Sequence, residues 1–296
     1  MSRRPKLAAQ QLGEGPDVVL IHGLATNRAF WYATAVALQD RYRVTIFDLR
    51  GHGYSERPAN GYRPVDFAED TLGLMDALQI RRAALVGHSY GGAAALEASG
   101  IAPERVSHLA LVDTRVARIQ PLMRLHDTPV ITEAEKEVAA THDADWAALP
   151  QVGYLFLEAA ARMRISGKLP QARDDFTPFG EGRGALRAAR AWLDLLDHTS
   201  AREELDQPGM TEEAIRALRM PVLLMYGALS RCVHSGRALQ ALLPQARYVE
   251  VPDAGHFFPL SRPQLVLDAL REFLCAVPVG APSGATFMQA DKGGRG

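Results

Sequence analysis

The sequence predicts an α/β fold, in which a mostly parallel, twisted sheet carries helices on both faces and a helical insertion interrupts the chain. Short apolar, β-branched runs alternate with helical patterns over the first 114 residues, and this alternation returns after residue 220. Between these parts, residues 115–219 contain no run that resembles a buried strand. Because strands that alternate with helices pair in parallel, we assign both outer parts to one sheet.

The expected elements follow from the spacing of the apolar residues. Buried strands are expected at 17–21, 44–47, 83–86, 109–112, 222–227 and 248–251. Helices of the sheet part are expected at 28–38, at 65–78, directly after the 83–86 strand and at 263–275. The insertion predicts helices at 132–141, 154–165 and 184–196, with an exposed loop at 170–184.

These patterns divide the chain into three parts. Residues 1–114 and 220–277 are expected to form the core, and residues 115–219 a mobile helical lid, or cap, over the site. Residues 278–296 are rich in Gly, Pro and Ala and lack a core pattern, so we expect a disordered tail.

Composition excludes several classes of protein. Hydrophobic residues make up 47% and charged residues 23%, which is typical of a soluble globular protein with a core. The net charge of −1 offers no basic field for nucleic acid or a membrane surface, and no apolar run has transmembrane length. Cys232 and Cys275 form no disulfide framework, and no apolar segment follows the basic N-terminus. We therefore expect a cytoplasmic protein, whose oligomeric state stays open.

The most informative stretch lies between the 83–86 strand and the helix that follows it. Here Gly87, Ser89 and Gly91 form a Gly-x-Ser-x-Gly pattern. A serine on a sharp strand-to-helix turn projects its Oγ above the sheet, and the glycines leave room for the strained backbone. The helix also directs its positive end at this point, where negative charge develops during acyl transfer. The strand before the pattern and the helix after it favour this interpretation over an ordinary turn.

Four motifs in order carry a family resemblance. They are His22-Gly23, the segment DLRGHGYS at 48–55, the serine turn at 87–91 and the segment PDAGH at 252–256. With these motifs the chain resembles the α/β-hydrolases with a serine nucleophile and an inserted helical cap. The resemblance covers the chain outside the cap and the tail.

This resemblance implies the catalytic roles. Ser89 is the expected nucleophile, and His256, late in the chain on a loop after the last strand, is the expected base. The oxyanion hole is expected to use the backbone N–H groups of Tyr90 and Leu24. No metal or organic cofactor is needed for this chemistry.

Other polar residues of the motifs have structural explanations. His22, His52 and His88 are expected to brace loops through hydrogen bonds. Asp48 is expected to organise its loop by accepting backbone N–H bonds, not to act in catalysis.

The triad acid departs from the family pattern. Most members carry it in a Gly-x-x-Asp segment after the strand at 222–227, but here Ser230 stands in that place and the loop has no carboxylate. We favour Asp113, at the end of another strand and 24 residues after Ser89, because some branches of the family place the acid there. The alternatives are that Asp113 only starts the first turn of the cap, or that Asp253 is the acid. Asp253 is the weaker rival, because it lies three residues before His256 on a tight loop.

The function expected from these residues is that of a serine hydrolase. It would cleave an ester, lactone or thioester of a small-molecule acyl substrate through an acyl-enzyme formed on Ser89. The dehalogenase and epoxide-hydrolase branches are disfavoured, because they need an aspartate in place of this serine. A carbon–carbon bond hydrolase or lyase remains an alternative, although Phe257 and Phe258 stand where that hydrolase branch often carries a tryptophan. A non-catalytic ligand-binding member is the other alternative.

Apolar residues of the cap suggest the roof of a pocket, although packing inside the cap explains most of them equally well. They are Phe156, Met163, Phe176, Phe179 and Trp192.

Overall fold

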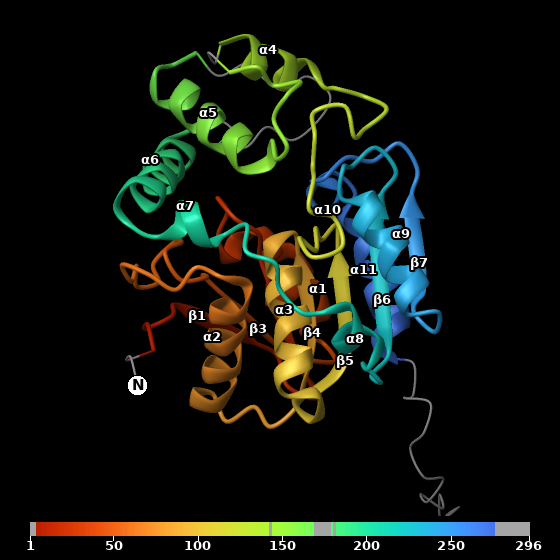
Figure 1. The fold of residues 1–296 in the computed structure, drawn as a ribbon. Helices are drawn as coiled ribbons and strands as arrows, with labels where there is room; N and C mark the ends of the chain where they lie inside the picture. Colours follow the sequence, from red (N-terminus) through yellow and green to blue (C-terminus); the bar gives the residue numbers. More distant parts are fainter. Residues whose placement is uncertain (1–3, 142–143, 169–178, 180–181, 276–296) are drawn as a thin grey trace, which may run out of the picture.

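The fold of the chain is taken from a computed structural model, which describes residues 4–141, 144–168, 179 and 182–275 (Figure 1). It contains a seven-stranded sheet with the order β1-β3-β2-β4-β5-β6-β7. Six neighbouring strands run parallel, and only β1 is antiparallel to its neighbour. The predicted fold class is confirmed. The strands are β1 Ala9–Leu12, β2 Asp17–Ile21, β3 Arg43–Phe47, β4 Ala83–His88, β5 Val106–Val112, β6 Val222–Gly227 and β7 Arg247–Val251.

The edge strand β1 is absent from the sequence prediction. Its sequence, AQQL, has no apolar run, and three of its four residues are exposed. It pairs antiparallel with β3, with Ala9 opposite Phe47. An edge strand buries too little surface to impose an apolar pattern, so periodicity alone could not find it.

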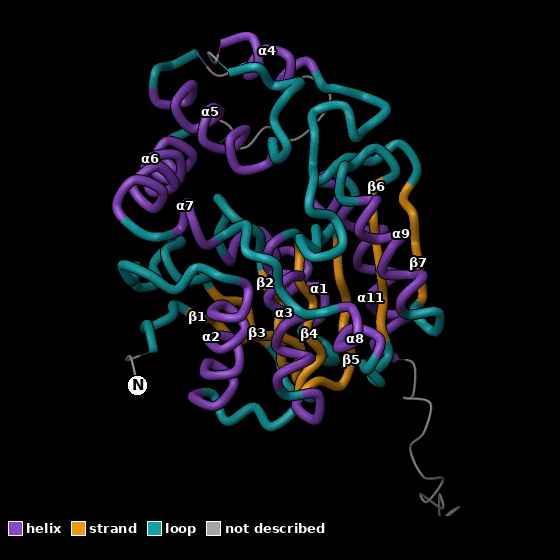
Figure 2. Tube along the Cα trace, viewed as in Figure 1, coloured by secondary structure: helices purple, strands orange, loops and turns teal. Residues whose placement is uncertain are grey.

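Helices cover both faces of the sheet (Figure 2). Side chains of β2 alternate between the faces: Val19 and Ile21 join one buried cluster, and Val18 and Leu20 join the other. Helices α2, α3 and α9 contribute to the first cluster, and α1 and α11 to the second. The bounds are α1 Tyr32–Leu38, α2 Pro64–Ala77, α3 Tyr90–Ile101, α9 Val233–Leu242, α10 Phe258–Ser261 and α11 Pro263–Cys275, with short 3₁₀ turns at Arg28–Trp31 and Pro103–Arg105.

In the segment between β5 and β6, the described residues form helices joined by loops and turns, and their only strand-like pairing is one isolated bridge between Met123 and Gln151. Its helices are α4 Glu133–Thr141, α5 Gly153–Ile165, α6 Arg183–His198, α7 Ala201–Glu204 and α8 Glu212–Arg216. Figure 1 shows α4, α5 and α6 above the carboxyl ends of the strands. The three helices predicted here therefore exist, with ends that differ by one or two residues. Most of the predicted loop at 170–184 and the whole tail at 278–296 lie outside the described residues.

The apolar residues singled out between β5 and β6 divide between two environments. Phe156 lines the pocket described below, whereas Met163, Phe179 and Trp192 are buried in a hydrophobic cluster. Phe176 lies outside the described residues. Among the helices that the structure describes, none has both the length and the apolar character that a membrane crossing requires.

Candidate active site

Ser89 stands on the turn that joins β4 to α3 and adopts a left-handed backbone conformation, with φ 54° and ψ −123°. Both flanking glycines are sterically required. A first side-chain carbon on Gly87 would lie 2.3 Å from the carbonyl oxygen of Gly91, and one on Gly91 would lie 2.4 Å from the carbonyl oxygens of Ile21 and His22. The strained turn is therefore possible only because Gly87 and Gly91 have no side chains to collide with the neighbouring backbone.

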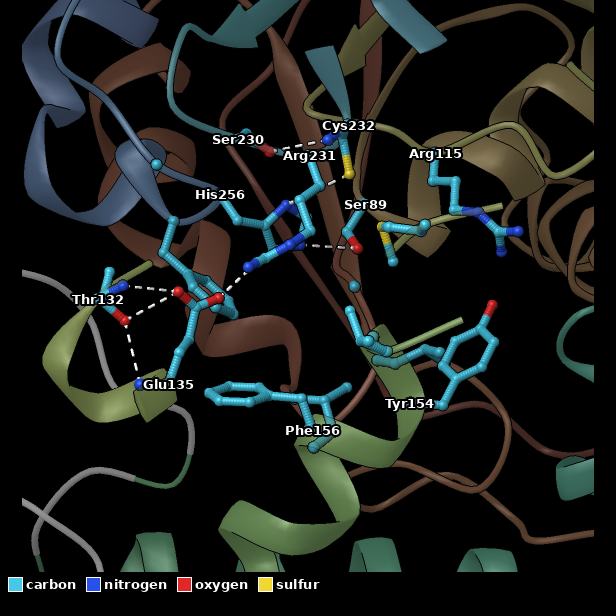
Figure 3. A pocket seen from close by; sticks show the side chains of 18 of the residues that line it. Ser89, Arg115, Thr132, Glu135, Tyr154, Phe156, Ser230, Arg231, Cys232 and His256 are labelled. Atoms are coloured by element: carbon cyan, nitrogen blue, oxygen red, sulfur yellow. Dashed lines mark hydrogen bonds and ion pairs between the residues drawn. The ribbon is translucent and has the colours of Figure 1, made fainter. Parts of the chain in front are cut away.

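His256 lies between Ser89 and Asp113, and Figure 3 shows its ring beside Ser89. Its Nε2 is 3.1 Å from the Oγ of Ser89, and its Nδ1 is 2.6 Å from the Oδ2 of Asp113. These three residues come from the β4–α3 turn, the loop after β7 and the end of β5. Nδ1 of His256 contacts the carboxylate of Asp113 and not that of Asp253.

The carboxylate of Asp113 is fully buried and held on every side. Its Oδ1 accepts the N–H of Gly227 at 2.8 Å, and its Oδ2 accepts the hydroxyl of Ser230. Its own N–H donates to the carbonyl of Met225 at 2.7 Å. Ser230, which stands where most of the family carries the acid, thus hydrogen-bonds to a carboxylate that follows the neighbouring strand. No local sequence pattern indicates this contact.

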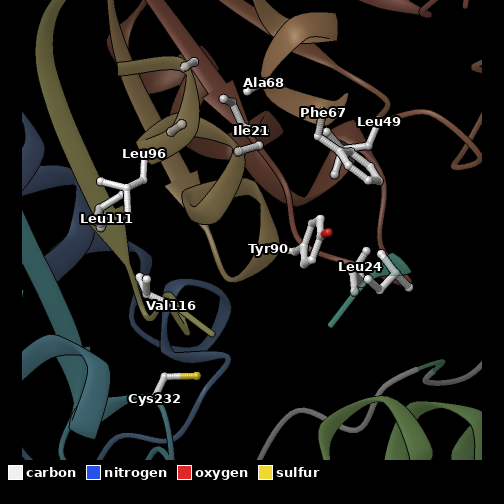
Figure 4. Packing of buried hydrophobic residues seen from close by; sticks show 14 of the residues in the cluster. Ile21, Leu24, Leu49, Phe67, Ala68, Tyr90, Leu96, Leu111, Val116 and Cys232 are labelled. Atoms are coloured by element: carbon white, nitrogen blue, oxygen red, sulfur yellow. The ribbon is translucent and has the colours of Figure 1, made fainter. Parts of the chain in front are cut away.

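Tyr90 and Leu24, the residues expected to form the oxyanion hole, both line the cavity with Ser89. Tyr90 is the first residue of α3, so its N–H is one of the helix donors without an acceptor inside the helix. Leu24 follows Gly23, at which a first side-chain carbon would lie only 2.8 Å from the Cβ of Ser89. The side chains of Leu24 and Tyr90 join the buried cluster drawn in Figure 4, and the Tyr90 hydroxyl donates to the carbonyl of Tyr62.

Two buried histidines brace the loops around this site, as expected. Nε2 of His22 accepts the N–H of Leu49 at 3.0 Å, and Nε2 of His52 accepts the N–H of Ala25 at 3.1 Å. Because Nε2 accepts in both rings, both histidines are neutral with the proton on Nδ1. Burial lowers the pKa of His22 to about 3 and that of His52 to about 4. The bond to Ala25 fixes the loop that carries Leu24.

His88 and Asp48 have similar structural roles. Nε2 of His88 donates to the backbone carbonyl of His256 at 3.0 Å, and burial holds the pKa of His88 well below its usual value. The carboxylate of Asp48 accepts the backbone N–H groups of Arg28 at 2.8 Å and Tyr54 at 2.9 Å. The predicted loop-organising role of Asp48 is confirmed.

Comparison with known proteins assigns the family. The model of the family described as alpha/beta hydrolase fold matches residues 16–263. The chain belongs to the α/β hydrolase fold family. The resemblance inferred from the four motifs is therefore confirmed, and the protein is a hydrolase.

Individual relatives align with nearly the whole length of this chain. The chain is 32% identical to the pimeloyl-[acyl-carrier protein] methyl ester esterase of Chromobacterium violaceum, over 90% of this chain and 98% of that protein. It is 27% identical to the 2-(acetamidomethylene)succinate hydrolase of Mesorhizobium japonicum, over 92% and 93% of the two chains. The solved enol-lactonase from Burkholderia xenovorans shares the fold, with a TM-score of 0.64, 23% identity and coverage of 92% and 97%.

Cys232 is a feature of the site that the sequence analysis did not select. It precedes α9, and its Sγ lies 3.8 Å from Nδ1 of His256 (Figure 3). Burial lowers the pKa of His256, but its contacts with the side chains of Cys232 and Asp113 outweigh burial and raise it. His256 is therefore a stronger proton acceptor than a free imidazole. The only signal in the sequence was that Cys232 follows Ser230 by two residues.

A cavity of about 1140 Å³ opens above Ser89 and His256. Its wall includes apolar side chains of the segment between β5 and β6: Met123, Leu125, Val130, Ile131, Phe156 and Leu157. It also contains two arginines with carboxylate partners. Arg115 lies 2.5 Å from Asp206, and Arg231 lies 2.5 Å from Glu135 of α4. The cavity thus places Ser89 beside a largely apolar wall, in which Arg115 and Arg231 are each paired with a carboxylate.

Proposed function

We propose that the hydrolase cleaves a carboxylic ester, lactone or thioester through an acyl-enzyme, with Ser89 as nucleophile, His256 as base and Asp113 as acid. The observation that carries this proposal is the unbroken chain of contacts from Ser89 Oγ to His256 Nε2, at 3.1 Å, and from Nδ1 to Asp113, at 2.6 Å. A hydroxyl, an imidazole and a carboxylate in this order are the arrangement that nucleophilic acyl transfer requires.

In the proposed mechanism, Nε2 of His256 takes the Ser89 proton while Oγ attacks the substrate carbonyl. The Asp113 carboxylate stabilises the imidazolium, and the N–H groups of Leu24 and Tyr90 bind the oxyanion. His256 then gives the proton to the leaving alcohol or thiol, which leaves an acyl group on Ser89. Water, deprotonated by the same ring, releases the acid and restores the serine.

The proposal extends to the organisation of the chain. Residues 1–114 and 220–277 would act as the hydrolase core, and residues 115–219 as the cap. Support comes from the cavity, whose wall combines the serine turn with side chains of α5 such as Phe156.

The cavity favours an uncharged acyl group. Its wall is mainly apolar, and the charges of Arg115 and Arg231 are compensated by Asp206 and Glu135. A substrate carboxylate that paired with Arg115 or Arg231 would have to displace the present partner of that arginine, at a cost in desolvation and lost ion pairing. The methyl ester esterase relative supports an ester, and the succinate-derived substrate named for the other relative is disfavoured by these pairs.

Covalent labelling tests the proposal. A fluorophosphonate probe should label the wild-type protein and a Ser261→Ala control, which lacks another serine of the cavity wall, but not Ser89→Ala. Ser89→Ala should remain folded and lose turnover of activated esters. Near wild-type turnover in Ser89→Ala would overturn the proposal, and unlabelled folded wild-type protein would favour a non-catalytic ligand-binding member instead.

A series of activated esters with graded acyl chains then defines the substrate class. We expect neutral chains to be turned over faster than a half-ester of a dicarboxylic acid of equal length. The opposite order would show that the cavity recognises a substrate carboxylate.

A further inference from the structure

We propose that Asp113, Cys232 and His256 form a binding site for a thiophilic divalent cation, represented by Zn²⁺ or Cd²⁺, and that occupation of this site inhibits the hydrolase. The inhibitory part rests on the proposed function. The binding part does not, because it depends only on the three side chains.

The three side chains have the ligand atoms and the spacing for such an ion. A carboxylate oxygen, a thiol sulfur and an imidazole nitrogen lie within 4.8 Å of one another. Tetrahedral zinc, with bonds of about 2.0–2.3 Å, separates such ligands by about 3.4–3.6 Å. The distance between Cys232 Sγ and His256 Nδ1 is 3.8 Å, and that between Nδ1 and Asp113 Oδ2 is 2.6 Å. Shifts of about 1 Å in these side chains would therefore place the three ligand atoms at three corners of a zinc coordination tetrahedron.

The fold holds the ligands in place and leaves a path to them. Asp113 directly follows β5, Cys232 precedes α9, and His256 follows β7, so each ligand is attached to a different element of the fold. Asp113 is 0% and Cys232 5% exposed, yet Cys232 and His256 both line the cavity. An ion can thus enter from the cavity, and a water there can supply the fourth ligand.

Charge also favours a divalent ion. A bound ion would meet the carboxylate of Asp113 and the thiolate of Cys232, so its two positive charges would be compensated inside the buried site. Binding releases the thiol proton and moves the ring proton of His256 from Nδ1 to Nε2.

The shift of that ring proton accounts for inhibition. Nε2 faces the Oγ of Ser89 at 3.1 Å and must have a free lone pair to accept the serine proton. With the ion on Nδ1, Nε2 carries a hydrogen and donates toward Ser89 instead. The ion also occupies Asp113, which would otherwise stabilise the imidazolium.

Cadmium binding tests the site without any substrate. The full-length protein, stripped with a chelator, is titrated with Cd²⁺ while the ultraviolet absorption of the cadmium–thiolate bond and the bound metal are measured. The matched variants are Cys232→Ser and Cys275→Ser. Cys275 is the other cysteine of the chain, and its sulfur contacts Tyr42 and not the proposed ligands. Wild type and Cys275→Ser should bind one ion with a thiolate band. Cys232→Ser should lack the band and bind at least about tenfold more weakly.

Inhibition by Zn²⁺ is then measured with an activated ester, each variant relative to its own metal-free rate. The concentration for half inhibition should rise at least about tenfold in Cys232→Ser and stay at the wild-type value in Cys275→Ser. A thiolate band that persists in Cys232→Ser, or equal inhibition of all three proteins, overturns the inference. Cadmium binding that requires Cys232 in a protein without esterase activity would instead refute the proposed function and retain the metal site.

Discussion

At the scale of single residues, two neighbouring strands supply the surroundings of His256 Nδ1. Asp113 follows β5 and faces the ring at 2.6 Å, while Ser230 follows β6 and donates its hydroxyl to the same carboxylate oxygen. The two residues have unequal tasks. The carboxylate can stabilise a positive imidazolium, whereas the hydroxyl can only orient the carboxylate.

We expect Asp113→Asn to lower kcat roughly 10⁴-fold, because an amide in this place favours the wrong tautomer of the histidine. Ser230→Ala should lower kcat only about tenfold, the equivalent of about 1.4 kcal/mol for one hydrogen bond. Steady-state kinetics with an activated ester measures both values, and thermal unfolding shows whether each variant is folded. A folded Asp113→Asn variant with most of its activity would mean that another group serves as the acid.

The candidate site could be selected largely from the sequence, because motif and spacing identify Ser89, His256 and Asp113. The roles of Ser230 and Cys232 could not. Ser230 contacts Asp113, 117 positions away, and Cys232 contacts His256 on the loop after β7, so both contacts depend on how the loop after β6 packs against other loops, which no local pattern records.

At the scale of elements, one ion pair connects α4 to the loop that precedes α9. Arg231, in that loop, reaches Glu135 on α4, and the two side chains are only 14% and 16% exposed. Arg231 also donates to the carbonyl of Leu125 at 2.7 Å, and Glu135 accepts the backbone N–H of Thr132 at 2.8 Å. The pair thus fixes the position of α4 and neutralises an arginine in the cavity wall.

We expect Glu135→Gln to shift substrate preference toward acids. Without its partner, the Arg231 guanidinium offers an uncompensated charge to a substrate carboxylate. The ratio of kcat/KM for a dicarboxylic half-ester to that for a neutral ester should rise about tenfold, or about 1.4 kcal/mol. Glu212→Gln is the control, because Glu212 pairs with Arg216 in an exposed position on α8 and neither residue lines the cavity. An equal change of the kcat/KM ratio in both variants would show that Arg231 does not determine the preference for acids.

Helices and strands could be predicted where burial of one face imposes a regular spacing of apolar residues. The strands of the sheet interior are apolar runs, and the first helix of the insertion was expected at 132–141 and is Glu133–Thr141. The polar edge strand β1 and the short helices α7 and α8 carry no such period. Their positions depend on neighbours, for example on Glu204 of α7, which accepts the N–H of Gly61 at 2.8 Å.

At the scale of the whole molecule, buried neutral histidines link stability to pH. Burial lowers the pKa of His22 to about 3 and of His52 to about 4, and holds that of His88 well below its usual value. In the unfolded chain each ring takes up a proton near pH 6.5. Between about pH 6.5 and pH 4 the unfolded state therefore binds more protons, and stability falls as the pH falls.

We expect the free energy of unfolding to decrease by up to about 4 kcal/mol per pH unit over this window, or about 1.4 kcal/mol for each of the three histidines. Denaturant titrations at several pH values between 6.5 and 4.5 measure the slope. His52→Gln should reduce the slope by about one proton, whereas His198→Gln, at an exposed position, should leave it unchanged. A stability that is flat across this range would contradict the neutral state assigned to the three rings.

The hydrogen bond between Ser230 and Asp113 has a consequence for the evolution of such enzymes. An acid after β5 and an acid after β6 would approach the same histidine, so an ancestor that carried both could lose either one and keep its chemistry. The carboxylate could thus migrate from strand to strand during divergence. A classification that demands an acid at position 230 would discard this chain as a dead enzyme, although a buried carboxylate lies 2.6 Å from its histidine.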